Sequence, residues 1–160
     1  MSGSEKSTRR LFSYRVRNTL LTIHIAVSVG LLGDCAGLLA IAVRASRMGD
    51  PAAANETLRV LNMLAKTFGI PLSFATLISG VTLGLGTKWG ILQYPWVIAK
   101  LLLTLAVILT GALVFGPALR PILAGAAGPT QPLIAAAAFD LVALATATGL
   151  SVFKSGRRLR

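Results

Sequence analysis

The chain has 160 residues, of which 54% are hydrophobic and 13% charged, and it carries a formal net charge of +11. Soluble domains average about 45–50% apolar and about 25% charged residues, so this composition excludes an ordinary soluble enzyme and a disordered tail. The single cysteine, Cys35, excludes a disulfide scaffold. The positive charge could indicate a nucleic-acid-binding protein, and the placement of the basic residues decides that question.

The basic residues stand in blocks at the two ends of the chain. Five precede the first apolar run (Lys6, Arg9, Arg10, Arg15, Arg17) and four follow the last (Lys154, Arg157, Arg158, Arg160). A nucleic-acid-binding surface instead spreads lysine and arginine along a stripe with polar and aromatic residues between them. The sequence therefore predicts no nucleic-acid partner.

The predicted elements begin with a basic arm over residues 1–17 and end with a basic tail over 156–160. Between them stand four apolar stretches, at about residues 20–43, 66–87, 96–118 and 133–153. Each has about 20 residues or more, which is enough to cross a hydrocarbon core of about 30 Å at 1.5 Å per residue. The sequence thus predicts an all-α integral membrane protein, a four-transmembrane-helix bundle within residues 18–155.

The connections between the stretches contain helix-breaking residues. Gly49-Asp50-Pro51 predicts a helix stop and turn, with a new helix beginning near Thr57. Pro71 lies about one turn into the second stretch and is expected to bend it outward. In the third connection, glycines and prolines are expected to prevent a continuous helix: Gly116, Pro117, Pro121, Gly125, Gly128, Pro129 and Pro132.

The charges of the connections predict the orientation. If the N-terminus is cytoplasmic, eleven cations lie on that side and five (Arg44, Arg47, Arg59, Lys66, Arg120) on the other. This asymmetry follows the positive-inside rule, so both termini are expected to face the cytoplasm. We expect a multi-pass protein of the bacterial inner (cytoplasmic) membrane whose first partners are membrane lipids.

Two acidic residues lie inside the predicted spans. Asp34 lies ~13 Å from the outer end of the first span and Asp140 ~10 Å from the outer end of the fourth, counted at 1.5 Å per residue. Small residues share the helix face of each aspartate, and small residues mark close helix contacts. Both side chains are therefore expected to point into the bundle, and ionisable residues in a membrane are functional candidates.

A carboxyl group in an apolar cavity can serve as a proton donor while a second carboxylate stabilises a developing cation. The sequence accordingly predicts Asp34 and Asp140 as catalytic residues acting on a lipophilic substrate. Further residues are expected to line the substrate site: Ser73, Phe74, Thr76, Trp89, Tyr94 and Trp96. The alternative is that an aspartate only bonds a serine or threonine on the second helix and fixes the packing.

Two basic residues also lie near the cytoplasmic ends of the spans. Lys100 is expected to extend towards the interface. His24 is the only histidine; it could bind haem or a metal, but one histidine makes a poor site, and ligation by two histidines requires a second protomer. A hydrogen-bonded interfacial histidine is the expected role, with no cofactor and no metal.

Two segments carry a family resemblance: His24 through Asp34, and Leu85-Gly-Thr-Lys-Trp-Gly continuing through Tyr94-Pro-Trp-Val-Ile-Ala-Lys100 to Thr104. They resemble a family of small bacterial four-helix membrane proteins of unknown function, over roughly residues 18–155. The resemblance implies the fold but no activity. In size, topology and buried acids the chain is also similar to small membrane-bound bacterial terpene cyclases, which protonate an epoxide or alkene inside the bilayer.

Three functions are compatible with these patterns. The first is a membrane-embedded enzyme, a cyclase or isomerase for a lipophilic, isoprenoid substrate, with the aspartates supplying acid catalysis. The second is a proton- or cation-coupled transport or channel component, which would act as a homo-oligomer because four helices enclose little space. The third is a structural accessory subunit. The enzyme is the leading hypothesis, since the cytoplasmic half offers few polar residues for a transport path.

Overall fold

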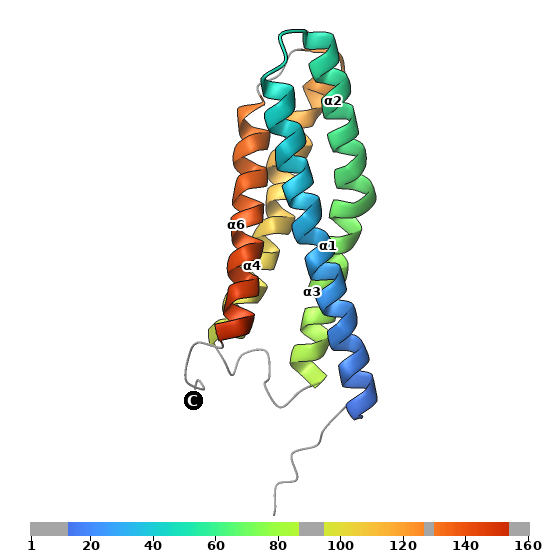
Figure 1. Ribbon diagram of the computed structural model, residues 1–160, viewed down its shortest axis with the longest axis vertical. Helices are drawn as coiled ribbons and strands as arrows, with labels where there is room; N and C mark the ends of the chain where they lie inside the picture. Colours follow the sequence, from blue (N-terminus) through green and yellow to red (C-terminus); the bar gives the residue numbers. More distant parts are fainter. Residues whose placement is uncertain (1–12, 87–94, 127–129, 154–160) are drawn as a thin grey trace, which may run out of the picture.

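The computed structural model describes residues 13–86, 95–126 and 130–153, and these residues form an all-helical bundle (Figure 1). Four helical spans are long and apolar enough to cross a membrane: Tyr14–Ser46, Pro51–Gly86, Pro95–Leu123 and Gln131–Ser151. The predicted fold class is thereby confirmed. We call the end where the first helix begins and the last helix ends the terminal end, and the opposite end the far end.

The first span is one helix, α1 (Tyr14–Ser46), and it is longer than the apolar stretch alone predicts. The Ser13 side chain caps it by accepting a hydrogen bond from the backbone N–H of Val16 at 3.4 Å. Capping satisfies a donor that the first turn leaves free, so the helix can begin among basic residues of the expected arm. At its other end, basic Arg44 lies in the last turn, where a cation suits the helix dipole.

The second span begins at Pro51, six residues before the expected restart near Thr57. Asp50 accepts a hydrogen bond from Ala52 N–H at 2.9 Å, and Pro51 occupies the first helical position, where its missing N–H costs nothing. The span comprises α2 (Pro51–Leu64), a π-helical turn η1 (Ala65–Gly69) and α3 (Ile70–Gly86). The Asp-Pro pair that predicts a helix stop is thus also a helix start.

The third span also contains a π-helical turn. It comprises α4 (Pro95–Thr110), η2 (Gly111–Phe115) and α5 (Gly116–Leu123). The helix runs through Pro117 and Pro121, so it ends five residues later than the expected third stretch, and the break expected in this connection follows Leu123. The widened turn of η2 stands directly before Pro117 and accommodates its missing N–H. The helix ends beside Gly125, whose positive φ of 87° favours glycine.

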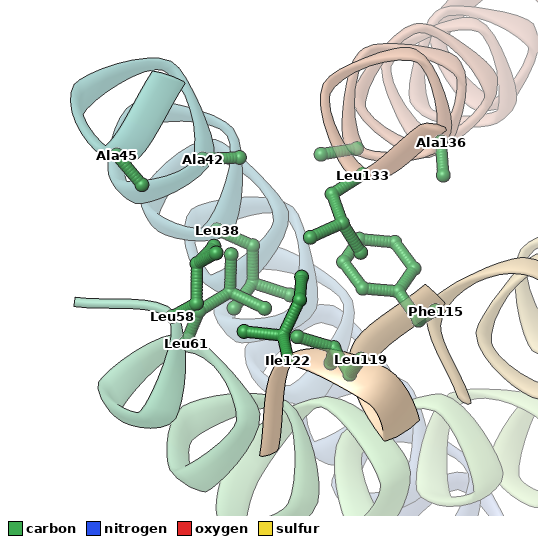
Figure 2. Packing of buried hydrophobic residues seen from close by; sticks show 11 residues of the cluster. Leu38, Ala42, Ala45, Leu58, Leu61, Phe115, Leu119, Ile122, Leu133 and Ala136 are labelled. Carbon is green, nitrogen blue, oxygen red and sulfur yellow. The ribbon is translucent and has the colours of Figure 1, made fainter. Parts of the chain in front are cut away.

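The last span is α6 (Gln131–Phe153), which packs between α1 and α4. At the far end, α1, α2, η2, α5 and α6 enclose one apolar cluster (Figure 2). We call this the far-end cluster; its most deeply buried members are Ala42, Leu58, Leu61, Ile122 and Leu133. None of the buried polar side chains among the described residues belongs to this cluster, so this end of the bundle interior is apolar.

Outward-facing side chains along the spans are also apolar. Ile25, Val29, Ile78, Leu102 and Val142 are each about half or more exposed, as a lipid environment requires. Five polar side chains instead lie buried inside the bundle: Ser73, Thr76, Ser79, Thr104 and Asp140. This inside-out distribution marks the interior as the place to look for function.

Candidate functional site

The functional candidates lie along two antiparallel helix pairs, and the first is α1 with α3. His24 contacts Ser79 and Gly80, Gly30 faces Leu72, and Asp34 faces Gly69. The contacts fix an antiparallel register: the ten residues from His24 to Asp34 on α1 run alongside the ten residues from Ser79 to Gly69, in the opposite direction. By this register Ser28 stands opposite Thr76, so polar side chains line one helix interface over ~15 Å.

Asp34 packs against the π-helical turn η1. A Cβ atom placed on Gly69 would lie 2.9 Å from Asp34 Oδ2, so only glycine allows this approach. The Oδ2 atom is buried and has no hydrogen-bond partner among the described residues. π-Helical turns occur frequently at functional sites. The structure therefore places an unpartnered carboxyl oxygen against irregular backbone, deep within the spans.

Asp140 belongs to the second pair, α6 with α4, and is 5% exposed. The Thr110 side chain, just before η2, lies within hydrogen-bonding reach of its carboxyl group. Thr110 Oγ1 is also 2.9 Å from the carbonyl of Ala106, to which it can donate. The hydroxyl has a single proton, which it donates either to the Ala106 carbonyl or to the Asp140 carboxylate; in the first case it can accept a hydrogen bond only from a protonated carboxyl group. Thr110 is therefore a hydrogen-bonding partner for Asp140 in either protonation state.

The two aspartates flank Cys35, which is buried and lies within electrostatic reach of both. Asp34 faces α3 and η1, whereas Asp140 faces α4, so each carboxyl has its own surroundings. The structure brings both to a similar depth, as the sequence predicts, at ~18 Å from the end of α1 and ~14 Å from the start of α6. Cys35 stands between them.

The two basic residues lie nearer the terminal end, one on each helix pair. His24 Nδ1 is 2.8 Å from Ser79 Oγ, which also lies 2.6 Å from the carbonyl of Ala75. Lys100 donates to Ser151 Oγ at 2.6 Å and lies 5.8 Å from the Trp96 ring centroid. The two basic groups lie within electrostatic reach of each other. Each helix pair therefore carries an acid deep inside and a base nearer its end.

Four buried side-chain atoms lack a hydrogen-bond partner in the described part of the chain: Ser28 Oγ, Asp34 Oδ2, Thr76 Oγ1 and Asp140 Oδ1. All four lie inside the bundle, at or between the levels of His24 and the aspartates. An unsatisfied buried polar atom costs about 1–3 kcal/mol. Such atoms usually bond water or take part in chemistry.

One groove lies away from these groups. It is open and is lined by Ala40, Val43, Arg44, Arg47 and Met48 at the far end of α1, so it includes neither aspartate. Within residues 13–86, 95–126 and 130–153, no group of three or more His, Cys, Asp or Glu side chains could hold a metal ion. The chemistry of the interior thus rests on single polar groups.

A family model described as a predicted integral membrane protein, DUF2269, matches residues 18–155. The chain belongs to this family. It is an integral membrane protein with four spans, in agreement with the resemblance of its first and third spans to such proteins. No curated protein and no solved structure matches the chain. The similarity to terpene cyclases therefore has no support from known proteins.

The structure distributes the predicted lining residues over several places. Ser73 and Thr76 are buried on the inner face of α3, whereas Phe74 is 48% exposed on its outer face. Trp96 lies beside Lys100, far from the aspartates. Trp89 and Tyr94 lie outside the described residues. The four described residues, Ser73, Phe74, Thr76 and Trp96, therefore lie in different places rather than along one wall.

Sequence reasoning missed several members of the interior. Gly69, Thr110, Ser151 and Ser28 each contact a candidate residue or carry an unpartnered atom. Their signal is weak, because serine, threonine and glycine are common in membrane helices as packing residues. Only the register between helices distinguishes them.

Proposed function

We propose that the protein is a proton-coupled membrane transport component in which Asp34 and Asp140 take up protons that enter from the terminal end. The observation that carries this proposal is the set of four unpartnered buried atoms on Ser28, Asp34, Thr76 and Asp140. Chains of Asp, Glu and His within membrane spans serve as proton relays in pumps and transporters. This interior has the same ingredients.

The path runs along the α1/α3 interface. When Ser79 donates to the carbonyl of Ala75, it accepts from His24 Nδ1–H, and Nε2 is left to exchange protons. The hydroxyls of Ser28 and Thr76 come next, and Asp34 follows. Each hydroxyl can both accept and donate, so together with water it can pass a proton on.

The far-end cluster gives the path a direction. Its buried side chains are all apolar, and Leu38 within it lies one turn beyond Asp34. Protons can therefore reach the aspartates from the terminal end, and they cross the apolar barrier beyond them only when the protein changes conformation. Access from one side at a time suits coupled transport better than an open channel.

The competing enzyme hypothesis uses the same carboxyl groups. Acid-initiated cyclisation or isomerisation of an isoprenoid-like substrate requires space for that substrate against a carboxyl oxygen. The groove at Ala40–Met48 includes neither aspartate, while Gly69 packs closely on Asp34. A structural accessory role is also less favoured, because unpartnered buried oxygens weaken packing. The geometry favours proton transfer over both alternatives.

Proton flux into proteoliposomes tests the proposal. Vesicles that contain the purified full chain and a pH-sensitive dye are given a potassium diffusion potential, negative inside. We expect the wild type to acidify the lumen faster than protein-free vesicles. Asp34→Asn and Asp140→Asn should each reduce the rate to that of protein-free vesicles, because asparagine cannot carry the proton.

The matched control is Asp50→Asn. Asp50 caps α2 at the far end, outside the interior, and asparagine caps a helix equally well. This variant should retain the wild-type rate. A wild-type rate in both Asp34→Asn and Asp140→Asn, with the reconstituted amounts matched, would contradict the proposal, as would a wild type no faster than protein-free vesicles.

A further inference from the structure

Lys100 is a half-buried cation near the terminal end of the bundle. Its ammonium group donates to Ser151 Oγ at 2.6 Å and lies 5.8 Å from the Trp96 ring centroid. Trp96 is one turn nearer the start of α4, and Ser151 is two residues before the last residue of α6. The side chain therefore extends towards the helix ends and places its charge near the level where headgroups begin.

No acidic group balances this charge in the part of the chain that the structure describes. Four acidic residues are described, and Asp50 and Glu56 of these lie at the far end. Asp34 lies about ten residues further into α1 than His24, and Asp140 about ten residues further into α6 than Ser151. Arg59 is the partner of Glu56, at 3.2 Å. Among the residues that the structure describes, Lys100 has a hydroxyl and an aromatic ring as partners but no carboxylate within ion-pair distance.

A second basic group, His24, lies within electrostatic reach of Lys100 and is held on α1 by a 2.8 Å contact with Ser79. Two basic groups within reach of each other repel when both are charged, and an anion that contacts both would offset the repulsion. The two residues come from different helix pairs, Lys100 from α4/α6 and His24 from α1/α3.

We propose that Lys100 and His24 bind the phosphate group of an anionic phospholipid at the terminal end of the bundle. A lysine ammonium is a common phosphate ligand, and hydroxyls such as that of Ser151 add further hydrogen bonds. Basic positions between membrane helices bind anionic headgroups in this way.

The surroundings favour a lipid over a free anion. The flanking faces are apolar and suited to acyl chains, as at the half-exposed Ile25 and Leu102. The basic blocks of residues 6–17 and 154–160 adjoin the same end in sequence and attract anionic lipid to it. The phosphate of the bound lipid then lies between the helices at Lys100, and its acyl chains lie against the apolar outer faces.

Native mass spectrometry of the purified full chain tests this site. The protein is titrated with phosphatidylglycerol or with phosphatidylcholine of the same acyl chains, and the first retained lipid is counted. We expect the wild type to retain phosphatidylglycerol preferentially. Lys100→Met should weaken this first binding event by about tenfold or more, the usual effect of losing a charged hydrogen bond. The matched control Lys66→Met, at an exposed position on η1, should bind as the wild type does.

Two further arms keep the result decisive. Ser151→Ala retains the Lys100 cation but removes the hydroxyl to which it donates, so it should weaken lipid binding less than Lys100→Met does. This variant tests the site if Lys100→Met does not fold. Inorganic phosphate in millimolar excess should not displace the lipid. Undiminished first binding in both Lys100→Met and Ser151→Ala, equal binding of phosphatidylcholine, or displacement by inorganic phosphate would each overturn the assignment.

Discussion

The contact between Asp34 and Gly69 leaves no room for a side chain at position 69. The carboxyl oxygen lies 2.9 Å from the place where a Cβ atom would stand, which is closer than real Cβ atoms come to any neighbour. The neighbour in this case is a short acidic side chain on a packed helix, so it cannot yield as a lysine would. The position of the carboxyl group therefore depends on this glycine.

Gly69→Ala should displace the Asp34 carboxyl group, which lowers proton flux in proteoliposomes and destabilises the protein by about 1–3 kcal/mol, the usual cost of overpacking. Gly33→Ala is the control, because a Cβ atom there meets nothing within 4 Å. Thermal unfolding and flux measured on the same preparations check both. A Gly69→Ala variant with wild-type flux would show that the position of this carboxyl group is irrelevant.

At the residue scale the sequence predicted the carboxyl groups but not their neighbours. Asp34 and Asp140 stand out because charge is rare within apolar stretches. Gly69, Thr110 and Ser151 do not stand out, since their importance depends on which residue of another helix lies opposite. That register comes from side-chain packing over a whole interface, which a single sequence does not display.

The two π-helical turns have the same relation to a proline and to an aspartate. Each spans five residues, Ala65–Gly69 or Gly111–Phe115, and each ends two residues before a proline, Pro71 or Pro117. In both, the carbonyl four residues before the proline belongs to the middle of the turn, where widening relieves the clash with the proline ring. One turn contacts Asp34, and the other directly follows the Thr110 neighbour of Asp140.

Pro71→Ala should allow η1 to tighten into an α-helix and to withdraw Gly69 from Asp34. Because proline within a helix costs about 3 kcal/mol, we expect a melting temperature equal to or above that of the wild type together with a lower proton flux. Pro121→Ala in α5 is the control and should leave the flux unchanged. An unaltered flux in Pro71→Ala would show that proton flux does not depend on the π-helical turn η1.

At the element scale, the helices were predictable and their irregularities only partly so. Length and hydropathy identify the four spans. The outward bend predicted at Pro71 stays a prediction, and the structure has a π-helical turn two residues before that proline, because a proline can be accommodated by a kink, a break or a widened turn. In the third span the predicted helix of residues 96–118 continues through Pro121 to Leu123.

Across the whole molecule, polarity changes along the bundle axis. The half towards the terminal end contains His24, Ser79, Lys100 and Ser151, whereas the far end is closed by the far-end cluster (Figure 2). The basic residues that give the net charge of +11 follow the same asymmetry, since most of them stand in the sequence next to the terminal end. In the function proposed above, protons enter from the polar side and meet the apolar barrier at the other side.

The most direct test of this account is proton flux through Leu38→Ser, measured with and without Asp34→Asn. Leu38 is 6% exposed and belongs to the far-end cluster one turn beyond Asp34, so a serine there extends the polar path into the barrier. The account predicts a flux above wild type in Leu38→Ser that falls to the rate of protein-free vesicles when Asp34→Asn is added. A flux that does not rise, or one that rises and persists without the Asp34 carboxyl group, would contradict it.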